Sequence, residues 1–341
     1  MLTGRPTTEL GPVGLILPTL PQNTIPAWAA DPSVGVHGGA EGAEAPTGNP
    51  MTGFAALCQE AEGLGASALW ATDHLFWHGA HLECMVALTV AATATQRARV
   101  GTCVMQLPLR QASAVAKQAA ALQQLSGGRF VLGVGVGVHA GEYEEAGVDY
   151  HTRGHQLDAG IAELRRSWQS GDGVALGDIT AGGSARYRQL PAPAAVPVWV
   201  GGSSEAALRR AARAADGWMP LFVEPTEYAD ALQRLAEETA RAGRDPGAVT
   251  PSMVLFVSID DDVDKGRRRG TEWMSSMYGI PAKAFERHMI AGSASEVAEV
   301  VATYRRAGAE HVVLYITEDE PLDQFERLVT ALPAAGIDPR R

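Results

Sequence analysis

The sequence has few cysteines, no excess of basic charge and no long apolar run, and each shortage excludes a class of protein. Only three cysteines occur in 341 residues, at positions 58, 84 and 103, and no two of them form a CxxC pair. This usage indicates reduced thiols and not a disulfide framework. Acidic residues outnumber basic ones by 39 to 28, giving a formal net charge of −11. Such an acidic balance argues against a nucleic-acid-binding or basic membrane surface.

Membrane spans and several common catalytic motifs are also lacking. No apolar stretch approaches the roughly 20 residues that a membrane helix needs. The N-terminal residues "MLTGRPTTELGPVGLILP" make a poor signal peptide. The sequence contains no GxSxG, no Walker loop and no HExxH motif. We therefore expect a cytoplasmic protein, with nothing specific to suggest a hydrolase or a kinase.

What the sequence does contain is a regular alternation of short apolar runs and amphipathic stretches. Eight runs predict strands, at residues 13–18, 67–74, 100–105, 130–136, 196–202, 217–222, 254–260 and 312–317. Between them lie Ala- and Leu-rich stretches of helical periodicity, many of which end in glycine. Eight such units are the signature of a (β/α)8 barrel. A doubly wound sheet is the alternative, but no phosphate loop follows the first run.

We predict one domain over residues 1–341 with three long insertions. These cover about 19–50, 170–195 and 261–293 and are expected to be loops; the charge run "DDVDKGRRRG" in the third is interpreted as a solvated charge run and not a nucleic-acid patch. Two of the three follow the carboxyl ends of strands, where barrel active sites are built. Ser293 and Glu296 are predicted to form a capping box at the start of a later helix.

The second predicted strand ends in "WATDHLFWHGAH", which places Asp73 beside His74. A histidine titrates near neutrality and a carboxylate can fix its tautomer, so this pair is a candidate acid/base. The alternative is that Asp73 caps the next turn. For His78 and His81 we expect surface loop positions. A metal site of His74, His78 and His81 near Glu83 is not favoured, because Gly79 interrupts the helical spacing, and we predict no metal.

Alternating glycines mark the fourth predicted strand, "FVLGVGVGVHAG". The run is not GxGxxG, because Val138 stands where the last glycine is needed. In a barrel, Gly133, Gly135 and Gly137 would thin the wall so that a flat ring could lie against the backbone. The alternative is packing around bulky neighbours.

A strand, a glycine turn and a helix start follow one another in "WVGGSSEAALRR", residues 199–210. Free N–H groups at the helix start next to Ser203 and Ser204 offer an anion site. An ordinary helix cap is about equally compatible with this pattern.

Together these motifs resemble the bacterial luciferase-like superfamily of flavin- and deazaflavin-dependent oxidoreductases. The resemblance is most specific over residues 100–168 and extends to 63–75, 197–220 and 292–316. It covers most of the chain from the first strand onward, although the 19–50 insertion is not typical of the family. The resemblance implies a (β/α)8 barrel that binds its redox cofactor at the carboxyl ends of the strands.

The resemblance also implies roles for individual residues. Asp73 and His74 would lie near the reactive ring carbon, with His74 as acid/base. A non-prolyl cis peptide behind the ring would map to Cys103–Val104. Residues expected to border the cofactor or hold its phosphate are Gly135, Val136, Gly137, Gly201, Gly202, Ser203 and Ser204.

Two departures from the family pattern affect the expected chemistry. Some F420-dependent dehydrogenases have a glutamate where this chain has Val138, so His74 or His139 would have to supply the proton. The tryptophan expected four residues after the histidine is His78, with Trp77 beside it. We expect Trp77, His78 and His139 to contact the substrate.

The resemblance leaves the reaction open between two cofactors. Hydride transfer between coenzyme F420 and a small organic substrate is favoured. The alternative is an FMN-dependent monooxygenase that uses O2 and reduced flavin from a separate reductase. A cofactor-free barrel that serves as a binding protein is a third alternative. Family members are often dimers, so a homodimer is expected.

Overall fold

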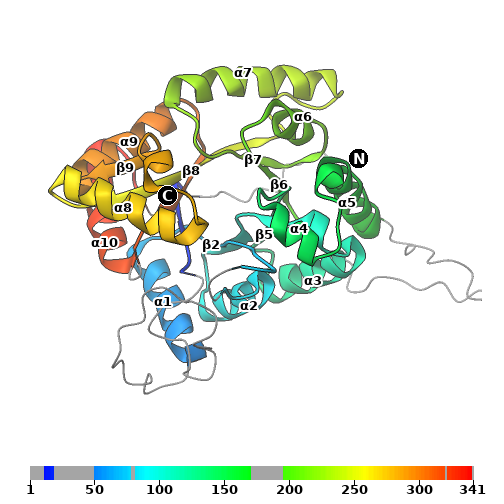
Figure 1. Cartoon of the computed structure of the whole chain (residues 1–341), viewed down its shortest axis with the longest axis horizontal. Helices are drawn as coiled ribbons and strands as arrows, with labels where there is room; N and C mark the ends of the chain where they lie inside the picture. The colour runs from blue at the N-terminus through cyan, green and yellow to red at the C-terminus, as the bar shows by residue number, and fades with distance from the viewer. Residues whose placement is uncertain (1–10, 19–49, 78–80, 170–194, 319–320, 340–341) are drawn as a thin grey trace, which may run out of the picture.

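Eight parallel strands close into a barrel, as the sequence predicts (Figure 1). The computed structural model describes residues 11–18, 50–77, 81–169, 195–318 and 321–339. The barrel strands are β1 (Val13–Ile16), β2 (Ala68–Ala71), β3 (Arg99–Thr102), β5 (Phe130–Gly135), β6 (Val198–Gly201), β7 (Gly217–Met219), β8 (Thr250–Ile259) and β10 (His311–Ile316). β10 pairs with both β1 and β8, which closes the barrel. Two short strands extend the wall: β4 (Met105–Gln106) pairs with β5, and β9 (Met289–Gly292) pairs with the end of β8.

Helices alternate with the strands and surround the barrel in Figure 1. They are α1 (Pro50–Leu64), α2 (Cys84–Ala94), α3 (Ala112–Leu125), α4 (Ala140–Glu145), α5 (Arg153–Gln169), α6 (Glu205–Ala214), α7 (Pro225–Arg241), α8 (Val263–Tyr278), α9 (Ala294–Arg306) and α10 (Pro321–Ala331). The described residues also form the 3-10 turns η2 (Leu107–Leu109), η3 (Tyr150–Thr152), η4 (Ala282–Phe285) and η5 (Leu332–Ala335). The predicted capping box is confirmed at the start of α9, where Ser293 and Glu296 bond each other's backbone N–H.

The segment 261–293 is folded, so the expectation of a loop there is wrong. The charge run belongs to α8, which begins where the Asp262 side chain accepts a hydrogen bond from the Lys265 N–H at 3.1 Å. The charges lie on one side of the helix, and Gly270 and Met274 are buried on the other. Helical periodicity was thus hidden by the small size of the buried residues. The other two predicted insertions, 19–50 and 170–195, lie almost entirely outside the described residues.

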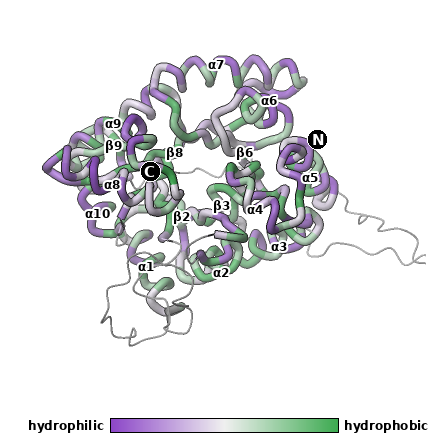
Figure 2. The backbone as a smooth tube through the Cα atoms, viewed as in Figure 1, coloured by the Kyte–Doolittle hydropathy of each residue, from purple (hydrophilic) through white to green (hydrophobic). Residues whose placement is uncertain are grey.

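Strand side chains alternate between two apolar clusters, one inside the barrel and one under the helices. Figure 2 shows mostly apolar colouring on the strands and hydrophilic colouring on the outer turns of α7 and α8. The rings of Trp70, Trp199 and His311 fill the barrel interior, with centroids 5.4 to 6.3 Å apart. A Cβ at Gly101 or Gly217 would overlap these indole rings, so glycine on neighbouring strands makes the packing possible.

His311 is buried in this interior in its neutral form. Its Nδ1 lies 2.8 Å from the Gly11 carbonyl, and its Nε2 accepts a hydrogen bond from the Trp70 indole N–H at 3.1 Å. Burial lowers the pKa of His311 from 6.5 to about 4. The unfolded chain therefore takes up a proton at a higher pH than the folded chain does, and stability is lost as the pH falls from 6.5 to 4.

We expect this histidine to contribute up to about 3 kcal/mol to the acid-induced loss of stability. Denaturant unfolding at several pH values between 7 and 4 should show a flatter dependence for His311→Asn than for the unmodified chain. His155→Asn, at an exposed position of α5, serves as the control and should keep the original dependence. Equal dependences in all three proteins would contradict the prediction.

Among the described residues, no helix combines the length and apolar character needed to cross a membrane.

Candidate active site

His74 follows β2 at the carboxyl end of the barrel, and its ring is held by a carboxylate from α4. The His74 Nδ1 lies 3.0 Å from Oε2 of Glu142, whose side chain is only 3% exposed. Oε1 of Glu142 accepts a hydrogen bond from the Leu75 N–H at 3.2 Å. Burial raises the pKa of Glu142, but hydrogen bonds from His74 and Gln106 outweigh it and the net shift is downward. Because an ionised carboxylate only accepts, Nδ1 of His74 must donate, which leaves Nε2 for chemistry.

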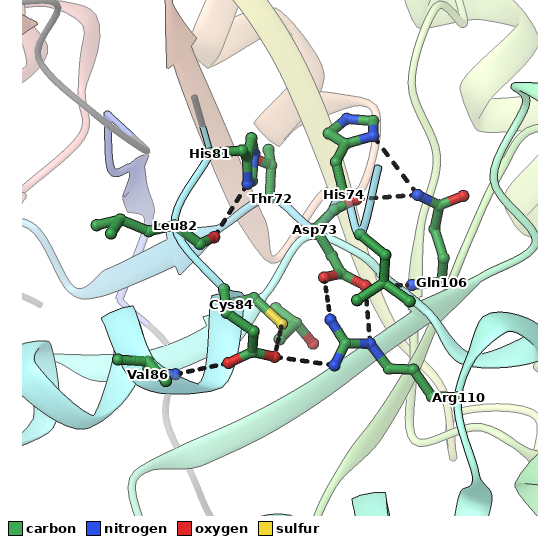
Figure 3. A network of polar contacts seen from close by, with 12 residues as sticks. Thr72, Asp73, His74, His81, Leu82, Cys84, Val86, Gln106 and Arg110 are labelled. Atoms are coloured by element: carbon green, nitrogen blue, oxygen red, sulfur yellow. Dashed lines mark hydrogen bonds and ion pairs between the residues drawn. The ribbon is translucent and has the colours of Figure 1, made fainter. Parts of the chain in front are cut away.

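The neighbouring carboxylate does not fix the His74 tautomer, so that part of the interpretation of the Asp73–His74 pair is wrong. Asp73 instead pairs with Arg110 after η2, with Oδ1 and Oδ2 at 2.5 and 3.3 Å from guanidinium nitrogens. Its Oδ2 also accepts the Gln106 N–H at 2.9 Å. Figure 3 shows the Asp73 carboxylate turned toward Arg110 and away from the His74 ring. Asp73 thus links the segment that contains Gln106 and Arg110 to the end of β2.

Gln106 connects these groups. Its Nε2 donates to the Asp73 carbonyl at 3.1 Å and to Oε2 of Glu142 at 3.0 Å. Both partners are acceptors, which establishes the orientation of the amide. Its Oε1 is buried and has no hydrogen-bond partner among the described residues. A buried acceptor without a donor is costly, so a ligand N–H or O–H, or a water, is expected at this atom.

The glycines in and just after β5 leave space beside the backbone, but other atoms of the protein fill that space. A Cβ at Gly133 would overlap the Thr102 carbonyl, and one at Gly135 would come within 2.5 Å of the Val104 side chain. A Cβ at Gly137, whose φ is +66°, would overlap Oε1 of Gln106. At all three positions, therefore, the absence of a side chain allows packing against neighbouring protein atoms, as the alternative interpretation predicts. The glycines admit the segment that follows β3, and a cofactor contact at Gly135, Val136 or Gly137 stays a prediction.

The peptide bond between Cys103 and Val104 is cis, which confirms the expectation drawn from the family resemblance. Both residues are partly exposed and lie between β3 and β4. A Cβ at Gly201 on β6 would come within 2.8 Å of the Val104 side chain, so the bulge reaches across β5 to β6. Glycines on two strands thus accommodate a single bulge.

Aromatic rings form a wall beside His74. The Trp77 indole stacks on the His74 ring at 3.7 Å between centroids, and the His139 ring meets Trp77 edge-on at 4.7 Å. Tyr278, at the end of α8, meets Trp77 edge-on at 6.0 Å. The structure thus brings Trp77 and His139 together at the site, while His78 lies outside the described residues.

His81 is half-buried, so the expectation of a surface position for it is wrong. Its Nδ1 lies 3.0 Å from the Leu82 carbonyl and its Nε2 lies 3.0 Å from the Thr72 hydroxyl. Burial, and then the proximity of His74, lower the pKa of His81 to about 4. A neutral His81 accepts at Nε2 from Thr72, and its ring packs edge-on against His74 at 5.1 Å.

The "GGSS" turn lies where β6 leads into α6. Ser204 caps α6 by accepting the Ala207 N–H at 3.2 Å, and the Ser203 hydroxyl bonds the Leu221 carbonyl after β7. Gly202 has a φ of +109°, which disfavours any side chain there. The cap that the sequence allowed is present, and binding of an anion by this turn stays a prediction.

Acidic and thiol groups cluster beside Arg110. Single ligand atoms of Asp73, Glu83 and Cys84 lie within 4.8 Å of one another. Arg110 pairs with both carboxylates, at 2.5 Å to Asp73 and 2.9 Å to Glu83. Burial first, and then the charge of Asp73, raise the pKa of the Cys84 thiol, so it stays protonated. The positive charge between these acidic side chains is that of the guanidinium.

Sequence reasoning missed Glu142, Gln106 and Arg110. Glu142 follows the glycine run in "HAGEYEE", and a carboxylate in the first turn of a helix after a barrel strand was a usable signal. Arg110 in "QLPLRQ" gave no such signal, because its role depends on partners 27 and 37 residues away.

Comparison with known proteins identifies the family. Residues 32–269 match the model of the luciferase-like monooxygenase family. A protein of Mycobacterium tuberculosis described as uncharacterised is 35% identical over 193 residues, 55% of this chain and 63% of its own. The phthiodiolone/phenolphthiodiolone dimycocerosates ketoreductase of Mycobacterium kansasii is 31% identical over 205 residues, 57% of this chain and 54% of its own. The chain thus matches less than two thirds of the length of these relatives.

Solved structures of low sequence identity share the fold. An F420-dependent secondary alcohol dehydrogenase with an F420–acetone adduct superposes with a TM-score of 0.72 at 19% identity, covering 84% of this chain and 96% of its own. A monooxygenase of Streptomyces bottropensis gives 0.71 at 18% identity, covering 95% and 98%. Because the family model matches residues 32–269, well over half of the sequence, the chain belongs to the luciferase-like monooxygenase family.

Proposed function

We propose that the protein is an F420-dependent oxidoreductase that interconverts a small organic carbonyl compound and its alcohol. The observation that carries the proposal is His74 at the mouth of the barrel, oriented through Nδ1 by a buried carboxylate and leaving Nε2 without a partner among the described residues. A histidine held in this way is suited to move one proton to or from a substrate oxygen.

The comparisons support the choice of cofactor and reaction by analogy. F420 is named for the secondary alcohol dehydrogenase and for a tetrahydromethanopterin reductase of Methanopyrus kandleri, which superposes with a TM-score of 0.66 at 18% identity, covering 96% of this chain and 99% of its own. The M. kansasii relative is described as a ketoreductase. Two of these names, secondary alcohol dehydrogenase and ketoreductase, describe the interconversion of an alcohol and a carbonyl compound.

The residues present fit a planar redox ring. The buried Oε1 of Gln106 lacks a donor, and a ring N–H would supply one. The partly exposed bulge at Cys103–Val104 would back the ring, and the turn from Gly201 to Ser204 would hold its phosphate through backbone N–H groups. When bound, F420 would supply two-electron hydride chemistry.

The chain's own residues would handle the proton. An alcohol hydroxyl at Nε2 of His74 would pass its proton to the imidazole, and in the opposite direction the imidazolium would protonate the carbonyl oxygen. Glu142 would stabilise the imidazolium through Nδ1, while Trp77 and His139 would position the substrate and exclude water. A cytoplasmic homodimer stays a prediction.

FMN-dependent monooxygenation is the second candidate, because the family description and the S. bottropensis neighbour are both of monooxygenases. The assay that separates the two follows F420 absorbance with a panel of secondary alcohols and ketones, and oxygen uptake with reduced FMN. F420 turnover without oxygen uptake supports our proposal. Oxygen uptake that depends on reduced FMN, with no F420 turnover, contradicts it.

Replacing Glu142 by glutamine removes the charge that faces the imidazole. We expect turnover to fall about 10- to 100-fold, by analogy with the loss of other orienting partners of histidine.

Because the Glu142 pKa is lowered in the folded protein, its contribution to stability is present above its ordinary pKa and is lost as the pH falls through the lowered value. Unfolding measured from pH 7 to pH 3 should therefore show a smaller acid-induced loss for Glu142→Gln. Glu144→Gln, at an exposed position of the same helix, is the control. Unchanged turnover in Glu142→Gln would contradict the assigned role.

A further inference from the structure

A cavity of about 270 Å³ lies in the side wall of the barrel, between the β7–α7 connection, β8 and β9. It arises from the strand pairing. β7 pairs with Thr250 and Pro251 of β8, and Leu221, after β7, forms an isolated bridge with Val254. β9 pairs with β8 from Phe256 onward. The middle of β8 therefore has few strand-pairing partners on the edge that faces β7 and β9. Val300 of α9 lines the cavity from outside the barrel.

The walls of this side cavity are mainly apolar and its mouth is charged. Val254, Phe256 and Ile290 line it from the strands. Exposed Arg287 and partly exposed Glu224 both line the cavity and pair at 3.6 Å. An apolar pocket with a few polar groups at its opening is the usual form of a small-molecule site.

Phe222 lines the side cavity, is partly exposed to solvent and has an unusual backbone conformation. Its φ is +59°, a genuine outlier for a bulky side chain. Its ring stacks on Phe256 at 5.1 Å and meets the His288 ring at 4.7 Å. The neighbours hold the backbone in place, since the Leu221 N–H donates to the Ser203 hydroxyl and the Val223 carbonyl accepts from a tyrosine hydroxyl. Conformations of this kind cluster at active sites and ligand-binding segments.

The side cavity is close to the interior of the barrel. Phe256 stacks on Tyr315 at 5.1 Å, and the Tyr315 ring meets Trp273 edge-on at 5.5 Å. Phe256 and Tyr315 belong to the interior cluster, which the Cys103–Val104 bulge also contacts. Ring contacts therefore run from Phe222 in the side cavity through Phe256 to Tyr315 in the interior cluster, which also contacts the Cys103–Val104 bulge.

We propose that this side cavity is a subsite for the apolar arm of the organic substrate and that Phe222 selects the length of that arm. The proposal rests on the proposed function, because it assumes that the substrate is a small organic molecule. A cavity of about 150 Å³ is enough to bind benzene, so 270 Å³ accommodates an arm longer than one ring. The aromatic and aliphatic lining favours a hydrocarbon arm over a polar one.

The test measures binding of 1-butanol, 1-hexanol and 1-octanol to the full chain by calorimetry, without any cofactor. At about 0.8 kcal/mol per buried methylene, hexanol should bind about 10-fold more tightly than butanol. Val300→Trp fills the cavity from α9 and should weaken hexanol binding at least 10-fold. Val86→Trp, at an exposed position of α2, should leave it within twofold. Phe222→Ala should shift the preference toward octanol.

Equal hexanol affinity in Val300→Trp and the unmodified chain would overturn the proposal, as would the absence of alkanol binding to the unmodified chain. If Val300→Trp fails to fold, Thr303→Phe on the same lining provides the same test. A failed F420 assay together with alkanol binding that Val300→Trp abolishes would reject the proposed function and leave an apolar ligand site. F420 turnover with no effect of either filling variant would reject the subsite alone.

Discussion

Replacing His74 by alanine should lower turnover by about 10²- to 10⁴-fold, the range expected when a general acid/base is removed. The reason is geometric. Glu142 occupies Nδ1 of His74, which leaves Nε2 available at the carboxyl end of the barrel. His139 meets Trp77 edge-on, and its ring centroid is 6.4 Å from that of His74. Steady-state kinetics of F420 reduction or oxidation measures the change.

Two comparisons make this prediction specific. His151→Ala changes an exposed histidine in η3 and should leave turnover within twofold. Because the predicted loss lies in proton transfer, kcat should fall more than F420 affinity, and the pH profile of kcat should lose the limb that reports the imidazole. Turnover of His74→Ala close to that of the unmodified chain would show that the proton moves elsewhere.

Replacing Arg110 by methionine should lower the free energy of unfolding by about 3–5 kcal/mol. The guanidinium is the cation that faces both Asp73 and Glu83, and the Asp73 side chain is only 1% exposed. Without it, a buried carboxylate loses its counter-charge while methionine roughly preserves the length of the side chain. Denaturant unfolding at neutral pH measures the loss.

A second substitution distinguishes charge from packing. Adding Asp73→Asn to Arg110→Met removes the unpaired charge and should recover at least half of the lost stability, because asparagine still accepts the Gln106 N–H. Arg209→Met, which breaks an exposed pair with Glu205 at 4.0 Å, should cost less than about 1 kcal/mol. No recovery in the double variant would mean that packing around Arg110 matters more than its charge.

The barrel was predictable because each strand reads as a short apolar run bounded by turn residues. The run at 130–136 is an example, since burial on both sides makes Val131, Leu132 and Val134 all apolar. α8 was missed because Gly266 and Gly270 on its buried side carry no hydrophobic signal. A helix is recognised in a sequence by the periodic spacing of apolar residues, and a helix whose buried face includes glycines shows little of this periodicity.

The candidate site was predictable only in part. The Asp73–His74 pair was visible because both residues end a strand, yet their partners come from α4 and from the segment after β4. Such contacts depend on how the barrel closes, which spacing along the chain does not reveal. The glycine run does permit close approach, but the approaching groups belong to the chain itself, between Thr102 and Gln106.

The most direct test of the account is a titration of the purified apo-protein with F420, with oxidised FMN and with reduced FMN, followed by absorbance and fluorescence. We predict that F420 binds at least 10-fold more tightly than either form of FMN. We also predict that Gln106→Leu, which removes the buried acceptor Oε1, weakens F420 binding at least 10-fold. Tighter binding of reduced FMN would contradict the account in favour of oxygen chemistry, and binding of neither cofactor would remove the redox function altogether.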